Sequence, residues 1–80
     1  MHDRKLMTLA RMQTGLSGVV AQIQGEHGLV NRLSALGIIP GKRIIKISSM
    51  LMRGPVTIQV DRVQVAIGFG MANKIIVELD

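Results

Sequence analysis

The residue types that perform catalysis or bind metals are scarce in this sequence and stand apart from one another. The chain has 80 residues, with two histidines, five carboxylates and no cysteine. His2 and His27 are distant in the sequence, and Glu26 beside His27 is a pair of good metal ligands. Neighbouring side chains seldom converge on one ion, however, and two ligands rarely suffice. The sequence therefore predicts no resident metal site and no cofactor.

The acidic residues and the glycines also lack the spacing that catalysis requires. Asp3 and Asp80 lie near the ends of the chain and Asp61 falls in an expected turn, so no paired general acid and base is expected. Gly68-Phe69-Gly70 lacks the Lys-Ser/Thr of a phosphate-binding loop and indicates a bend between strands. We predict that the protein is not an enzyme.

Three large apolar residues stand where polar residues are expected. Met50-Leu51-Met52 lies between an expected strand and the Gly54-Pro55 turn. Three interpretations of this segment are open: packing in the core, contact with a partner, and weak Cu(I) binding by the two thioethers. An exposed apolar cluster marks a contact site, and methionine adapts its shape to a partner. The predicted partner-binding residues are Arg32, Met50, Leu51, Met52 and Arg53.

Composition narrows the classes of partner. The net charge of +5 suits an anionic partner such as nucleic acid, but scattered basic residues also suit ordinary solubility. With one Phe and no Tyr or Trp, the chain cannot build the stacking platforms of single-stranded nucleic-acid binders, so nucleic acid is an unlikely partner. No apolar run approaches the roughly 20 residues that span a bilayer, so no membrane insertion is expected. The lack of cysteine and of a signal peptide favours a cytoplasmic location.

Hydrophobic periodicity, with many isoleucines and valines, predicts about five short strands and one short helix. In the first long strand we expect Val19, Ala21 and Ile23 to share a face. In the second we expect Ile45 and Ile47 to face the core and Lys46 to face solvent. The strands are expected over residues 18–24, 42–49, 56–60, 63–67 and 75–79, and the helix over residues 29–36. Single helical turns are expected over residues 6–12, with Thr8 as cap, and over residues 71–74.

Two turns and a hairpin are also expected. Gly37 should end the helix as its left-handed residue, and Pro40-Gly41 should form a type II turn. Residues 56–67 predict a hairpin in which the two-residue loop Asp61-Arg62 brings all the apolar residues to one side. Five short strands bury their apolar faces best by curling into a small barrel. Residues 1–80 are expected to form a single, mainly β domain.

Three sequence blocks carry a resemblance to a known family. They are Arg32-Leu33-Ser34-Ala35-Leu36-Gly37-Ile38-Ile39-Pro40-Gly41, then Gly54-Pro55-Val56, then Val65-Ala66-Ile67-Gly68 followed by Ala72 and Ile75-Ile76-Val77-Glu78. Together they resemble the FeoA family, the small cytoplasmic partner of the FeoB ferrous iron transporter. The resemblance covers about residues 6–79. In relatives the loop after the second strand often carries an additional proline and an acidic residue, which residues 49–55 lack.

The resemblance implies an SH3-like small barrel with one short helix between its first two long strands. It also implies a role in iron uptake through contact with the cytoplasmic GTPase part of a FeoB-type membrane transporter. Fe(II) is linked to that function, but the family offers no uniform set of metal ligands. Two alternatives stand beside this expectation: a metal-binding regulatory module related to the C-terminal SH3-like domain of DtxR-type repressors, and a basic nucleic-acid-binding barrel. Self-association through the apolar loop is a further expectation.

Overall fold

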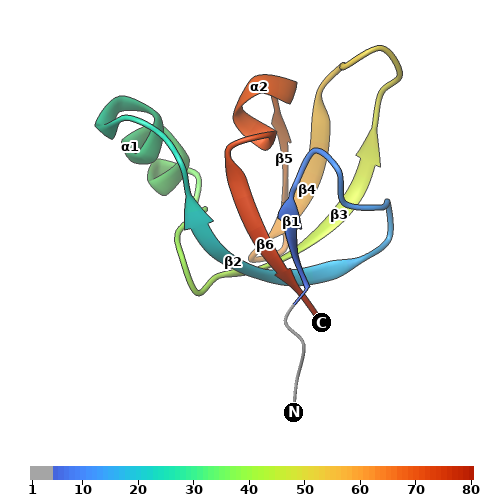
Figure 1. Ribbon diagram of the computed structural model, residues 1–80, viewed down its shortest axis with the longest axis horizontal. Helices are drawn as coiled ribbons and strands as arrows, with labels where there is room; N and C mark the ends of the chain where they lie inside the picture. Colours follow the sequence, from blue (N-terminus) through green and yellow to red (C-terminus); the bar gives the residue numbers. More distant parts are fainter. Residues whose placement is uncertain (1–4) are drawn as a thin grey trace.

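The computed structural model describes residues 5–80 as a curved antiparallel sheet of six strands with two short helices (Figure 1). The strands are β1 (Leu6–Thr8), β2 (Ser17–Ile23), β3 (Arg43–Ser49), β4 (Val56–Val60), β5 (Val63–Ile67) and β6 (Ile75–Leu79). The helices are α1 (His27–Ala35) and α2 (Phe69–Ala72). The order across the sheet is β1-β6-β2-β3-β4-β5. The predicted fold class is confirmed, with α1 between the two long strands β2 and β3.

The first strand is a correction to the sequence analysis, which expected a helical turn over residues 6–12. Leu6–Thr8 instead pairs antiparallel with β6 and adds a sixth strand at one edge of the sheet. Thr8 nevertheless caps a single turn, because its Oγ1 accepts a hydrogen bond from the backbone N–H of Arg11 at 3.3 Å. The carbonyl of Thr8 also accepts from the N–H of Met12 at 3.1 Å. Three residues are too few for periodicity to distinguish a strand from a helix.

A bulge in β2 changes which of its residues face the core. Where β2 pairs with β6, the register shifts between Val20 and Gln22. Val20 is buried before the bulge, Ala21 within the bulge is exposed, and Val19 is half-buried. The predicted face of Val19, Ala21 and Ile23 was therefore wrong, since one extra residue in a strand shifts every side chain after it to the other face.

The facing of β3 is also reversed relative to the prediction. Ile44 and Lys46 are buried, at 0% and 2% exposed, whereas Ile45 is 36% exposed. The ammonium of Lys46 donates hydrogen bonds to the backbone carbonyls of Leu9 at 3.0 Å, Ala10 at 3.2 Å and Met12. The segment between β1 and β2 thus closes around this cation, whose charge is compensated by three backbone carbonyls. Burial lowers the pKa of Lys46 below its usual value.

The turn predictions are confirmed. At the end of α1, the N–H of Gly37 donates to the carbonyl of Ser34 at 2.9 Å and that of Ile38 to Leu33 at 2.9 Å, with Gly37 at φ +88°. These two bonds form a Schellman motif, whose apolar contact is made by the buried Leu33 and Ile38. The Pro40-Gly41 turn closes through a hydrogen bond from Lys42 to Ile39 at 3.0 Å, with Gly41 at φ +93°.

The hairpin of β4 and β5 has the predicted register. Val60 pairs with Val63, Ile58 with Val65 and Val56 with Ile67. Asp61 and Arg62 occupy the loop with φ of 50° and 68°, as a type I′ turn requires. The resulting core is aliphatic, with the single helical turn α2 closing one end between β5 and β6. Its buried apolar residues are Leu9, Met12, Val20, Leu33, Ile38, Ile44, Val56, Ile58, Val60, Ile67, Ala72, Ile75 and Val77.

Candidate contact site on the β3–β4 loop

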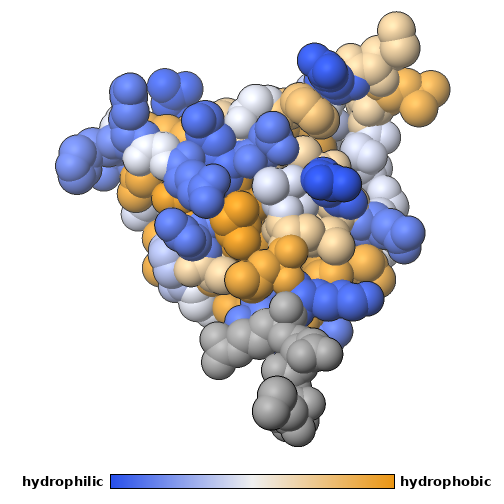
Figure 2. All heavy atoms as spheres, in the orientation of Figure 1, coloured by the Kyte–Doolittle hydropathy of each residue, from blue (hydrophilic) through white to orange (hydrophobic). Residues whose placement is uncertain are grey.

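The loop between β3 and β4 carries three strongly exposed apolar side chains, which we call the apolar tip. Met50 is 67% exposed, Leu51 90% and Met52 94%. The loop projects at the upper right of Figure 1, and Figure 2 shows apolar atoms at its far end. This exposure excludes the interpretation that these residues pack in the core. Exposed apolar clusters of this kind are typical of contact sites.

The apolar tip has a defined path because backbone contacts fix the base of its loop. The last pair of the hairpin joins Ser49 to Val56, and the N–H of Met50 donates to the carbonyl of Pro55 at 3.2 Å. Gly54 packs so closely that an added Cβ would lie 2.6 Å from the Cβ of Met50. Chain reversal itself occurs at residues 52 and 53, which have φ of 61° and 63°.

Arg53 connects the loop to α2. Its guanidinium carbon lies 5.9 Å from the centroid of the Phe69 ring, within the range of a cation–π interaction. Phe69 is the one aromatic residue of the chain and is half-buried. From the sequence Phe69 was expected only as part of a bend, and its contact with Arg53 was not predicted. One feature of the sequence pointed to such a contact: an aromatic residue stands between two glycines, although a bend needs no large side chain.

Arg32 lies apart from the apolar tip. It is exposed in the last turn of α1, and it borders a cavity of about 470 Å³ together with Glu26, Leu29 and Lys74. Figure 1 places α1 and the β3–β4 loop at opposite sides of the molecule, whose longest dimension is 36 Å. The structure therefore brings Met50, Leu51, Met52 and Arg53 together and leaves Arg32 on a separate surface.

The described residues contain no cluster suited to a metal ion. Between residues 5 and 80, no group of three or more His, Cys, Asp or Glu side chains comes together. Glu26 and His27 are both exposed at the start of α1. His2 and Asp3, also considered in the sequence analysis, lie outside the described residues. Over the same range, no helix is long and apolar enough to cross a membrane.

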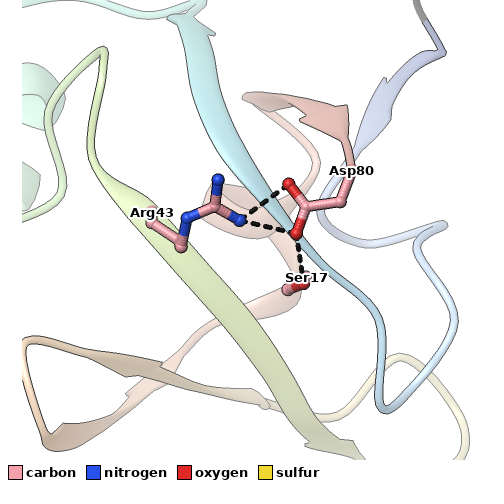
Figure 3. Close-up of polar contacts among 3 residues, drawn as sticks. All are labelled: Ser17, Arg43 and Asp80. Atoms are coloured by element: carbon pink, nitrogen blue, oxygen red, sulfur yellow. Dashed lines mark hydrogen bonds and ion pairs between the residues drawn. The ribbon is translucent and has the colours of Figure 1, made fainter.

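A separate polar cluster fixes the end of β6 (Figure 3). Arg43 of β3 donates to Asp80 Oδ1 at 2.7 Å, and the hydroxyl of Ser17 at the start of β2 donates to Oδ2. These hydrogen bonds hold the pKa of Asp80 below its usual value. Ser17 and Arg43 lie in the neighbouring strands β2 and β3, and Asp80 directly follows β6, so the cluster joins these three strands.

Solved structures similar to this chain include proteins of two kinds. A crystal structure of an iron uptake regulatory protein, FeoA, is 34% identical at a TM-score of 0.86, covering 95% of this chain and 99% of that one. The FeoA protein of Chlorobium tepidum is 19% identical at a TM-score of 0.82, covering 92% and 71%. A manganese-dependent transcriptional repressor is 20% identical at a TM-score of 0.88. That match covers the whole of this chain but only 45% of the repressor. The similarity to the repressor therefore concerns the fold alone.

The sequence also matches a family model. The model describes the FeoA domain and covers residues 7–79. A comparison with curated proteins finds no significant match. The SH3-like fold, the extent of the family match and the 34% identity to a FeoA structure agree with one another. The chain therefore belongs to the FeoA domain family, whose members are non-enzymatic accessory proteins associated with ferrous iron uptake.

Proposed function

We propose that this protein is a cytoplasmic accessory subunit that binds the GTPase part of a FeoB-type transporter and thereby modulates Fe(II) uptake. The observation that carries the proposal is the apolar tip, whose three side chains are 67%, 90% and 94% exposed. Membership in the FeoA family supports the choice of partner. The site needs no chemistry of its own, since a regulator of this kind acts through contact.

The contacts of the loop suit it for binding. Fully burying a large apolar side chain contributes about 1.5–3 kcal/mol, so three such side chains can dominate a small interface. Methionine and arginine are both enriched at protein interfaces, and Arg53 lies beside the apolar tip. The hydrogen bond from Met50 to Pro55 and the ring contact of Arg53 hold the loop in place. A loop that is already ordered loses less conformational entropy on binding.

Arg32 has a different place in this proposal. Because α1 lies away from the loop (Figure 1), a partner that contacts both surfaces must extend across the molecule. We therefore assign the main contact to the apolar tip and Arg53, with Arg32 as a second, independent contact. Replacing Arg32 with Ala is expected to weaken binding less than changes in the apolar tip.

An amide NMR titration tests the proposal. The labelled protein is titrated with the soluble cytoplasmic part of FeoB, with and without guanine nucleotide. We expect localised shifts at residues 50–53, and at least about tenfold weaker binding when Met50, Leu51 and Met52 are all replaced with Ser, because about 1.4 kcal/mol corresponds to each factor of ten. Nucleotide dependence of the shifts would connect the contact to the GTPase cycle.

The matched control is Leu16→Ser, which changes an apolar side chain that is 39% exposed outside the loop. This variant should bind as the unchanged protein does. If the triple Ser variant keeps its fold and binds FeoB with unchanged affinity, the apolar tip is not the contact. Sedimentation of the protein alone shows whether a second copy of this chain, instead of FeoB, covers the apolar tip.

A further inference from the structure

The methionines of this protein differ greatly in exposure. Met12 is 2% exposed in the core, and Met7 and Met71 pack partly buried against that core. Met50 and Met52, in contrast, are 67% and 94% exposed on the same loop. Oxidants in solution reach thioether sulfurs according to their exposure. The structure thus places two readily oxidised side chains within the apolar tip and shields the methionines of the core.

We propose that Met50 and Met52 form an oxidant-sensitive modification site, at which peroxide converts the apolar tip into a polar surface. In each reaction the sulfur donates an electron pair to one oxygen of hydrogen peroxide. The S–O bond of the sulfoxide forms and the O–O bond breaks, and the other oxygen, which takes up the proton of the transferred oxygen, leaves as water. Sulfur is oxidised by two electrons and peroxide is reduced by two. Sulfoxide reductases reverse this modification of methionine.

The position of the two sulfurs determines what oxidation does. Neither Met50 nor Met52 contributes to the hydrophobic core, so their oxidation leaves the fold stable. A sulfoxide is polar, and it replaces the apolar contact that a methionine offers to a partner. Leu51, between them, has no sulfur to oxidise. Two leucines would supply the same apolar area, whereas two methionines make that area responsive to oxidant.

The consequence for binding rests on the proposed function, while the oxidation itself does not. If the apolar tip contacts FeoB, oxidation detaches the accessory protein when peroxide is abundant. Ferrous iron reduces peroxide to reactive radicals, so such a switch would tie iron uptake to the level of oxidant. Reduction of the sulfoxides would restore the contact.

Peptide mapping tests the modification site on the intact, folded protein. The protein is treated with hydrogen peroxide, quenched at intervals and then digested with trypsin. Cleavage after Lys46 and Arg53 yields peptide 47–53 with both exposed methionines, while peptide 12–32 carries Met12 and peptide 63–74 carries Met71. We expect peptide 47–53 to be oxidised at least about tenfold faster than peptide 12–32, following exposure. Equal rates would overturn the proposal.

Binding measurements test the switch. The oxidised protein and the double variant Met50→Gln/Met52→Gln, which mimics the polar sulfoxide, should both bind the cytoplasmic part of FeoB at least about tenfold more weakly. The variant Met50→Leu/Met52→Leu has no sulfur in the apolar tip, so its own affinity, measured before and after peroxide treatment, should not change. Selective oxidation with unchanged binding would refute the switch. The triple Ser variant then shows whether the docking surface itself was wrongly assigned, because it removes the apolar tip without any oxidation.

Discussion

Lys46 shows how one residue can organise a segment distant in the sequence. Its side chain and its backbone both bind the segment between β1 and β2. The ammonium donates to the carbonyls of Leu9, Ala10 and Met12, and the backbone carbonyl of Lys46 accepts from the N–H of Gly15 at 2.7 Å. A lysine is usually found at the surface, and its burial here is compensated by carbonyl acceptors instead of a carboxylate.

Replacing Lys46 with Met should therefore destabilise the protein. The variant keeps most of the buried volume but removes the donor of the buried carbonyl of Met12 and the charged donor of the carbonyl of Leu9, at a cost of about 2–3 kcal/mol. Thermal or urea unfolding measures the change. Lys42→Met is the matched control, because Lys42 forms an ion pair with Asp61 at the surface and such pairs contribute about 0–1 kcal/mol. Equal effects of the two variants would contradict the role assigned to Lys46.

The carboxylate of Asp80 should make stability depend on pH in the acid range. The pKa of Asp80 in the folded state lies below its usual value of 3.8, because Arg43 and Ser17 donate hydrogen bonds to the charged form. Its stabilising contribution is thus complete above that usual value and is lost as the pH falls through the folded-state pKa. Unfolding free energies measured from pH 6 downwards should fall less steeply for Asp80→Asn than for the unchanged protein. Parallel curves would show that Asp80 contributes no such linkage.

At the scale of single elements, α1 contains two glycines with opposite roles. Gly37 follows the helix at φ +88°, where any other residue is strained, whereas Gly28 lies in the first turn with open space around its Cα. Gly37→Ala should lower the free energy of unfolding by about 1–2 kcal/mol, the cost of the left-handed conformation. Gly28→Ala should raise it by about 0.5–1 kcal/mol, because alanine favours the helix. Chemical denaturation of both variants checks the signs.

The elements that sequence reasoning predicted well share a local cause. The end of α1 at Gly37, the Pro40-Gly41 turn and the register of the β4–β5 hairpin all follow from residues adjacent in the sequence. The elements it predicted poorly depend on distant partners. The strand conformation of β1 comes from pairing with β6, and the bulge in β2 arises against that same strand. The local hydrophobic periodicity of β1 and of β2 does not show that β6 is their partner.

The candidate contact site was predictable in part. For the apolar run before Gly54-Pro55 the sequence left core packing and partner contact both open, and the structure shows residues 50–52 exposed. Sequence alone could not separate Arg32 from them, since α1 and the loop are set apart by the fold of the whole sheet. It also could not reveal the contact of Arg53 with Phe69, because α2 approaches the loop only when β4 and β5 are paired.

At the scale of the whole molecule, one face of a curved sheet encloses an aliphatic core, while the proposed contact site lies on a projecting loop. The same fold occurs in FeoA structures and within a manganese-dependent transcriptional repressor. A fold shared by different proteins leaves function to the surface, and above all to loops. In this chain the three side chains of the apolar tip lie outside the core, so changes in them should leave the core intact.

The pairing of Arg53 with Phe69 provides a natural spectroscopic reporter of that loop. Phe69 is the sole phenylalanine, and the chain has neither tyrosine nor tryptophan, so in heavy water, after the N–H groups have exchanged, its ring protons share the aromatic region of the proton spectrum only with those of the two histidines. Any event that moves Arg53 changes the surroundings of this ring. The oxidation of the neighbouring methionines can therefore be followed in unlabelled protein, without a fluorophore or an isotope.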